Sequence, residues 1–133
     1  MSKVEHIEYW IKSANDDWET VNSLFETKRY AHSLFFAHLV LEKWCKAHWV
    51  KDNEENLPPR IHNLVKLVVS TKLNLSEKQL NFLREFNDFQ LEGRYPDYQF
   101  ELHKRCNVEY TQKLLETVNK IKLCLQEKMQ SKP

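Results

Sequence analysis

The sequence contains very few of the residues that make tight turns. Its 133 residues include one glycine and four prolines. A β-sandwich or barrel needs a turn after every short strand, and such turns depend on glycine, proline, asparagine and aspartate. This shortage argues against an all-β fold and favours an all-α one. Because the length is that of one ordinary domain, we predict a single domain over residues 1–133, with its core at about 4–128.

The sequence also lacks long apolar runs and paired cysteines. No stretch approaches the ~20 apolar residues that a membrane-spanning helix requires. Residues 1–6 mix charges of both signs and lack the basic and apolar regions of a signal peptide. We therefore expect a cytoplasmic protein that does not cross a membrane. Cys45, Cys106 and Cys124 form an odd set without a CxxC pair, which favours reduced thiols over disulfides or a zinc site.

An excess of charge and the common catalytic motifs are missing as well. The net charge is +1, from 20 basic and 19 acidic residues, so no overall field attracts nucleic acid. The histidines lack the spacing of known metal-ligand motifs, and we expect neither a metal nor a cofactor. No glycine-rich phosphate loop, GxSxG motif or nucleophile beside a base is present. An autonomous hydrolase or kinase is therefore disfavoured.

Apolar residues recur at three- and four-residue steps along most of the chain, which is typical of helices that bury one face. Residues 30–50 are apolar nearly all round and predict a central or interfacial helix. Ser76 and Gln79 form a capping box, and the single glycine, Gly93, with Pro96 predicts a sharp break. The predicted helices cover about 4–25, 30–50, 60–70, 76–89 and 102–128. We expect an up-and-down bundle of four to five helices.

The aromatic content bears on the oligomeric state. Four tryptophans and seven phenylalanines are a heavy load for a small bundle, and core packing accounts for most of them. One bundle of this size would have difficulty covering residues 30–50 on every side. We therefore expect part of that helix to meet another chain, and a homodimer is the preferred explanation.

Polar residues within the apolar segment 30–50 form the first candidate site. Glu42 and Lys46 are four residues apart and can pair on one helical face, with Lys43 beside them. Such a pair on the surface contributes only about 0.3 kcal/mol. Since the surrounding helix is so apolar, a partly buried functional cluster is an equal alternative.

Two further positions are candidates for binding or catalysis. His62 follows a double proline, and a histidine there is more often a cap or a surface residue than a catalyst. Arg94 stands in the turn at 93–97, where a guanidinium can present its fork to a phosphate, and Tyr95 adds an aromatic face. Alternatively, Arg94 ties the turn to Glu42 or Asp97.

Four short segments in this order resemble a known family. They are KRYA at 28–31, AHLVLEKWCKA at 37–47, IHNL at 61–64 and GRYP at 93–96. Together the chain resembles the HEPN family, named for higher eukaryotes and prokaryotes nucleotide-binding, over about residues 6–128. The resemblance implies a dimeric helical bundle, often encoded beside a minimal nucleotidyltransferase with which it forms a complex or a toxin-antitoxin pair. Many such relatives are metal-independent ribonucleases, in which an arginine and a histidine a few residues later face one RNA-binding cleft.

This sequence departs from the ribonuclease pattern of that family. Arg94 and His103 are separated by eight residues that include a proline, and Arg29 and His38 are also separated by eight. Catalysis depends on the geometry of the acid and the base, and these longer spacings do not give the geometry of the family's arginine–histidine motif. The ribonuclease motif is therefore not met. The resemblance instead implies a nucleotide- or partner-binding module, with candidate contacts at Glu42, Lys43, Lys46, His62, Arg94 and Tyr95.

Three functions remain open at this point. In the first, Arg94 and Lys46 contact nucleotide phosphate, Glu42 orients them, Tyr95 stacks on the base, and a nucleotidyltransferase is the partner. In the second, the protein is a metal-independent endoribonuclease toxin that binds RNA and uses Arg94 with His103 or His62. In the third, it is a purely structural dimer whose charged cluster stabilises a turn.

Overall fold

Helices make up most of the part of the chain that the structure describes. The computed structural model describes residues 1–90 and 96–130, apart from the side chain of Tyr98. Within these ranges it has no strand. The six α-helices are α1 (Lys3–Glu26), α2 (Tyr30–Asp52), α3 (Leu64–Val69), α4 (Glu77–Phe86), α5 (Pro96–Arg105) and α6 (Val108–Gln130), with a short 3-10 turn η1 (Asn87–Phe89) after α4. The all-α prediction is confirmed.

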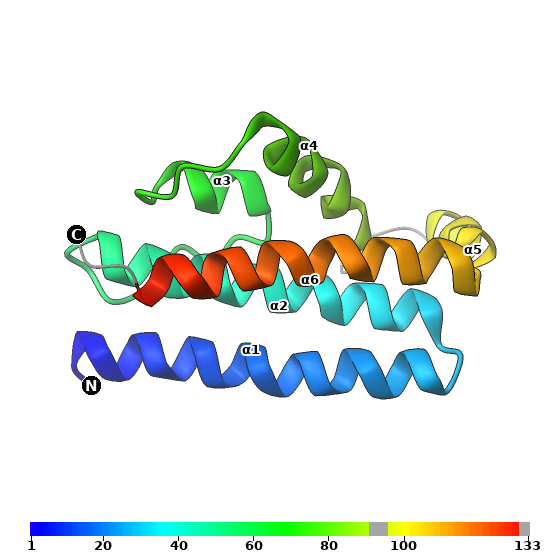
Figure 1. Ribbon diagram of the computed structural model, residues 1–133, viewed down its shortest axis with the longest axis horizontal. Helices are drawn as coiled ribbons and strands as arrows, with labels where there is room; N and C mark the ends of the chain where they lie inside the picture. Colours follow the sequence, from blue (N-terminus) through cyan, green and yellow to red (C-terminus); the bar gives the residue numbers. More distant parts are fainter. Residues whose placement is uncertain (91–95, 131–133) are drawn as a thin grey trace.

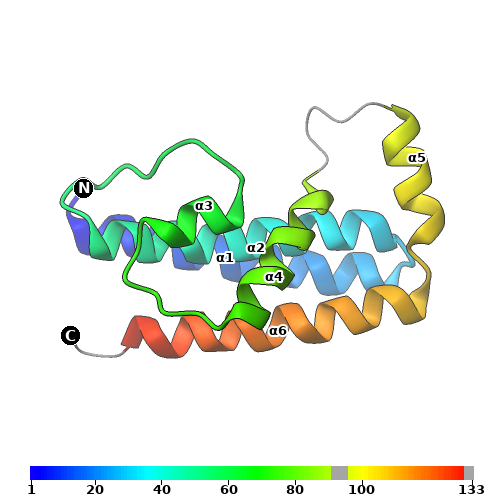
Figure 2. The ribbon, with the colours of Figure 1, turned by 90° about the horizontal axis from the view of Figure 1, so that it is seen from above.

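Three long helices build the body of the molecule. Helices α1, α2 and α6 run along its long axis, with α1 against α2 and α2 against α6 (Figure 1). Helices α3 and α4 form a second layer on the side of α2 and α6 that faces away from α1, and α5 lies across one end (Figures 1 and 2). Within the described residues, no helix is long and apolar enough to cross a membrane.

Local capping groups explain where α1 begins and where the chain reverses between α1 and α2. Ser2 and Glu5 form a capping box at the start of α1. At its end Lys28 adopts a left-handed φ of 65°, and the N–H of Arg29 donates to the carbonyl of Leu24 at 2.8 Å. This is the Schellman arrangement, here made without glycine. The chain therefore reverses within three residues and α2 packs antiparallel to α1.

Helix α2 is the centre of the core. Of its 23 residues 14 are buried, because α1, α3, α6, α5 and η1 all pack on it. Cys45 is completely buried, which raises the pKa of its thiol to about 12, so it packs as a small apolar side chain. Its own chain covers most of α2, but Phe35, Phe36, Leu39 and Trp49 stay partly exposed, so the expectation that part of this helix meets another chain stays a prediction. Homodimerisation itself stays a prediction.

The shorter helices differ from the predicted ranges for identifiable reasons. Asn63 caps α3 by accepting from the N–H of Lys66 at 3.0 Å, so this helix starts at Leu64 and not at residue 60. The predicted helix 102–128 is two helices, because Asn107 accepts from the N–H of Tyr110 at 2.8 Å and starts α6 anew. Pro96 opens α5, a position where proline is tolerated. The predicted cap at Gly93 lies outside the described residues.

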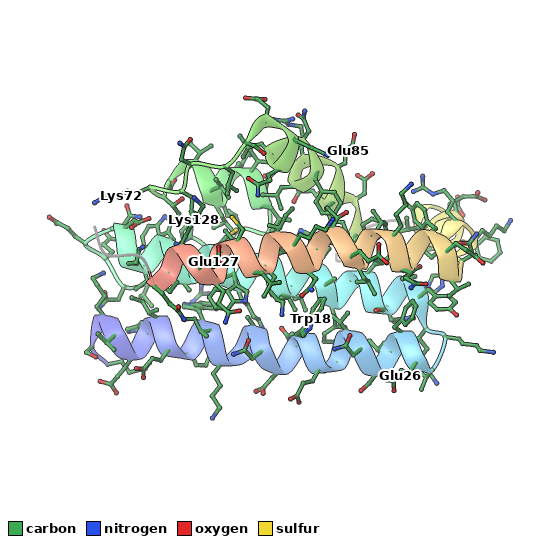
Figure 3. All side chains as sticks on the ribbon, viewed as in Figure 1. Trp18, Glu26, Lys72, Glu85, Glu127 and Lys128 are labelled. Atoms are coloured by element: carbon green, nitrogen blue, oxygen red, sulfur yellow. The ribbon has the colours of Figure 1, made fainter. Side chains whose placement is uncertain are left out.

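Charged side chains cover the outer faces of this bundle. Glu26, Lys72, Glu127 and Lys128 are among those at its outer surface (Figure 3). Trp18 projects from α1 toward α6, where Nζ of Lys122 lies 4.5 Å from its ring centroid. This pattern makes the charged groups that α2 carries inside the core stand out as exceptions.

Candidate functional site

A buried carboxylate on α2 is the centre of the candidate site. The side chain of Glu42 is 5% exposed. Its Oε2 lies 3.0 Å from Nζ of Lys46, and Nδ1 of His62 lies 3.1 Å from Oε1 and 3.2 Å from Oε2. The pair Glu42 and Lys46 is four residues apart on one helical face, whereas His62 arrives from the loop before α3. Burial therefore decides between the two sequence interpretations, because this is an internal cluster and not a surface ion pair.

A second set of contacts joins His38 and Asn87 to this cluster. Oδ1 of Asn87 accepts from the backbone N–H of Leu64 at 3.0 Å and lies 3.3 Å from Nε2 of His38. Because this oxygen accepts, Nε2 of His38 is the nitrogen that carries hydrogen. Burial lowers the pKa of His38, so its neutral form is favoured and Nδ1, 3.7 Å from Glu42, carries no proton. Glu42 is therefore held by Lys46 and His62, while His38 links α2 to η1.

Lys46 and His62 differ sharply in exposure. The side chain of Lys46 is 9% exposed, and its Nζ lies 5.3 Å from the ring centroid of Trp10 as well as beside Glu42. A phosphate cannot reach this ammonium without displacing those contacts. The side chain of His62 is 46% exposed. His62 is therefore the member of the cluster that a ligand can approach.

The other predicted site residues are not gathered here. Nζ of Lys43 points to α1, where it lies 2.6 Å from Oδ2 of Asp17 and 2.7 Å from Oγ of Ser13. The ring of His103 packs on that of His32 near the start of α2, with centroids 5.3 Å apart. Since His32 is about 15 Å along α2 from Glu42, His103 and His62 occupy separate places. Arg94 and Tyr95 lie outside the described residues.

Asn87 is a site residue that sequence reasoning did not find. It follows Leu80 and Leu83 on the buried stripe of α4 at helical spacing, and a polar residue on such a stripe is a signal for a buried hydrogen bond. The sequence does not tell which groups it meets, because His38 is 49 positions away. Within the described residues no group of three or more His, Cys, Asp or Glu is placed to hold a metal ion.

The fold and the cluster define a helical-bundle protein with a buried carboxylate that holds a half-exposed imidazole. A comparison with models of protein families matches the HEPN domain to residues 7–128. The chain therefore belongs to the HEPN domain family, as the four sequence segments suggested. No curated protein and no solved structure matches it.

The first prediction concerns the buried pair. Glu42→Gln leaves the ammonium of Lys46 buried without its counterion, so we expect a loss of about 3 kcal/mol in the free energy of unfolding. Lys46→Met should cost a similar amount, and the double variant clearly less than the two losses together. Urea denaturation measures all three. The matched control is the exposed pair Glu101 and Lys104, for which the same changes should cost less than about 1 kcal/mol. Additive losses at Glu42 and Lys46 would contradict the pairing.

The second prediction concerns pH. Burial lowers the pKa values of both His38 and His48 in the folded chain, so the unfolded chain binds protons first as the pH falls. The stabilisation is complete above the unfolded pKa of about 6.5 and is lost below it, by at most about 1.4 kcal/mol per pH unit for each histidine. Urea denaturation at pH 7.5, 6.5 and 5.5 measures this loss. His48→Gln should lessen it, and equal slopes for the variant and the wild type would show that His48 does not contribute.

Proposed function

We propose that this HEPN-family protein is a nucleotide-binding and partner-binding module. In this proposal it acts as a homodimer with a minimal nucleotidyltransferase, in the manner of a toxin-antitoxin pair. The observation that carries the proposal is the buried Glu42, which holds the half-exposed ring of His62 at 3.1 Å. A fixed, partly exposed imidazole beside a wall of apolar helix is a suitable contact for an anionic ligand.

Each candidate residue has a defined role in this proposal. Glu42 fixes the orientation of the His62 ring, as a carboxylate does for a histidine in other sites. Lys46 compensates the charge of Glu42 and does not serve as a phosphate contact, because it is 9% exposed. Arg94 binds phosphate through its planar fork, and Tyr95 stacks on the base. Lys43 stays with α1 through Asp17.

The nucleotide half of the proposal is tested by thermal melting. A nucleotide present at ten times its Kd should raise Tm by roughly 4 °C, and inorganic phosphate at the same concentration should raise it less. His62→Gln should reduce the shift, whereas Lys12→Gln on the outer face of α1 should not.

The partner half is tested with a tagged chain, which should copurify with a nucleotidyltransferase at a mass that includes two copies of the chain. If the nucleotide causes no shift in Tm and no transferase copurifies, the proposal is contradicted.

A second candidate function is metal-independent RNA cleavage. The contact between Glu42 and Nδ1 of His62 favours it, because a carboxylate that orients a histidine is the usual arrangement for acid-base catalysis. Arg94 would then stabilise the phosphate charge. His103 is a weaker choice of base, since it lies beside His32 and away from Glu42.

RNA cleavage in the presence of EDTA tests this second candidate. If the protein is a ribonuclease, His62→Gln and Arg94→Ala should each lower the cleavage rate by about 100-fold, while His6→Gln at the start of α1 should not. The rates are measured on a labelled RNA with equal amounts of folded protein. Cleavage that is indifferent to both substitutions would exclude the proposed site and indicate a contaminating nuclease.

A further inference from the structure

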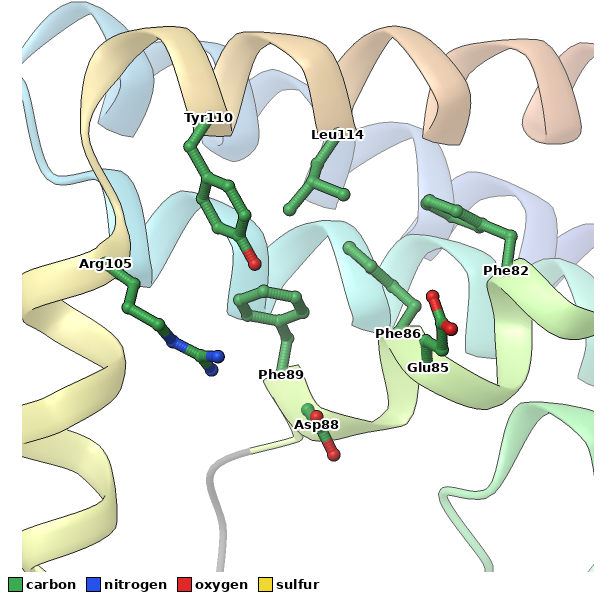
Figure 4. A pocket seen from close by; sticks show the side chains of 8 residues that line it. All are labelled: Phe82, Glu85, Phe86, Asp88, Phe89, Arg105, Tyr110 and Leu114. Atoms are coloured by element: carbon green, nitrogen blue, oxygen red, sulfur yellow. The ribbon is translucent and has the colours of Figure 1, made fainter.

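A pocket lies beside the α4–η1 segment, and its lining includes neither Glu42 nor Lys46 nor His62. It has a volume of about 360 Å³, within the range of ligand sites. Side chains from α4 and η1 form one wall and those from α5 and α6 the other (Figure 4). The lining residues are Phe82, Glu85, Phe86, Asp88, Phe89, Arg105, Tyr110 and Leu114.

The floor of this pocket is aromatic. The rings of Phe82 and Phe86 stack at 5.2 Å, and those of Phe86 and Phe89 lie 5.0 Å apart. Phe86 and Phe89 are almost fully buried, while Phe82 and Tyr110 at the sides are partly exposed. The phenol of Tyr110 points toward the ring of Phe89 (Figure 4). A flat group entering the pocket would therefore contact ring faces and edges.

The charged groups of the lining have an excess of negative charge. Glu85 and Asp88 contribute two carboxylates, and Arg105 contributes one guanidinium. Among the described residues, neither carboxylate makes a hydrogen bond or an ion pair with a side chain. Two carboxylates beside aromatic rings attract a cation, because both the ionic and the cation–π interaction favour positive charge. They disfavour a phosphate, which would face two like charges.

An arginine side chain matches this chemistry better than a lysine. Its guanidinium is planar, stacks on aromatic rings and places two N–H groups on one carboxylate. An ammonium is compact and cannot stack. A purely apolar occupant would leave Glu85 and Asp88 without partners, at a cost in desolvation. Buried arginines in pockets are also common anchors of protein interfaces.

We propose that this pocket binds an arginine side chain of a partner protein, with Glu85 and Asp88 as the carboxylates that hold it. Arg105 at the rim then meets an acidic residue close to that arginine in the partner. This inference rests on the partner-binding half of the proposed function, and it names the surface that the partner uses. None of Glu42, Lys46 and His62 lines the pocket, so the Glu42 cluster takes no part in this contact.

The first test uses a matched pair of small probes on the whole chain. N-acetyl-arginine methylamide, titrated into labelled protein, should shift the amide signals of residues 82–89 and 105–114 with a Kd on the order of millimolar. The citrulline analogue has the same shape without the charge, and it should bind roughly fivefold more weakly or worse. Equal binding of the two probes, shifts elsewhere, or no shift at all would overturn the proposal. This comparison needs no protein variant.

The second test uses variants and separates this inference from the proposed function. Glu85→Gln and Asp88→Asn should each weaken the arginine probe about fivefold, whereas Glu101→Gln on α5 should not. The double variant should also lose the copurifying nucleotidyltransferase. If the double variant keeps that partner, the pocket is not its docking site and the proposed function stands. If the wild type has no such partner while the arginine probe binds the pocket, the proposed partner is wrong and the arginine site stands.

Discussion

The buried carboxylate of Glu42 is the interaction on which the rest of the structure depends. A charge in a helix as apolar as α2 is tolerated only when it is paired and hydrogen-bonded. Lys46 lies on the same helix and provides one contact, but a carboxylate has more acceptor sites than one ammonium fills. His62 provides the second contact from a segment 20 residues away. The loop before α3 must therefore return to the middle of α2. This requirement positions the second layer of the fold, which α3 and α4 form.

The sequence predicted the helices well where they are long and one-sided. The ranges 4–25 and 30–50 agree with α1 and α2 to within two residues, because their apolar periodicity is uninterrupted. It failed at the start of α3 and at the break between α5 and α6, where single asparagines decide the boundary. Asn63 and Asn107 each cap a helix through the side-chain oxygen, and the periodicity of the apolar residues does not reveal this. The covering of α2 was also not predictable, since it depends on how α3 and η1 pack from far along the chain.

The candidate site was predictable in part. The spacing of Glu42 and Lys46 predicted their pairing, but the sequence left a surface pair and a buried one as equal alternatives, and only their burial in the structure decides between them. The sequence did not separate Lys43 from Lys46, although Lys46 lies one helical turn from Glu42 while Lys43 directly follows it, and a rotation of 100° per residue turns adjacent side chains away from each other. Lys43 therefore meets Asp17 on α1, while Lys46 meets Glu42. That His62 reaches Glu42 depends on the path of a loop, which periodicity cannot describe.

The end of α4 joins the two candidate surfaces. Asn87 contacts the N–H of Leu64 and the ring of His38, while the next two residues, Asp88 and Phe89, line the pocket. Phe86 takes part in both, because it forms the pocket floor and stacks on His38 with an angle of 19° between the rings. A side chain packed on both sides cannot move for one surface without disturbing the other. The hydrogen bonds that Asn87 makes for the cluster thus also hold the backbone that carries Glu85 and Asp88, and the two surfaces share one segment.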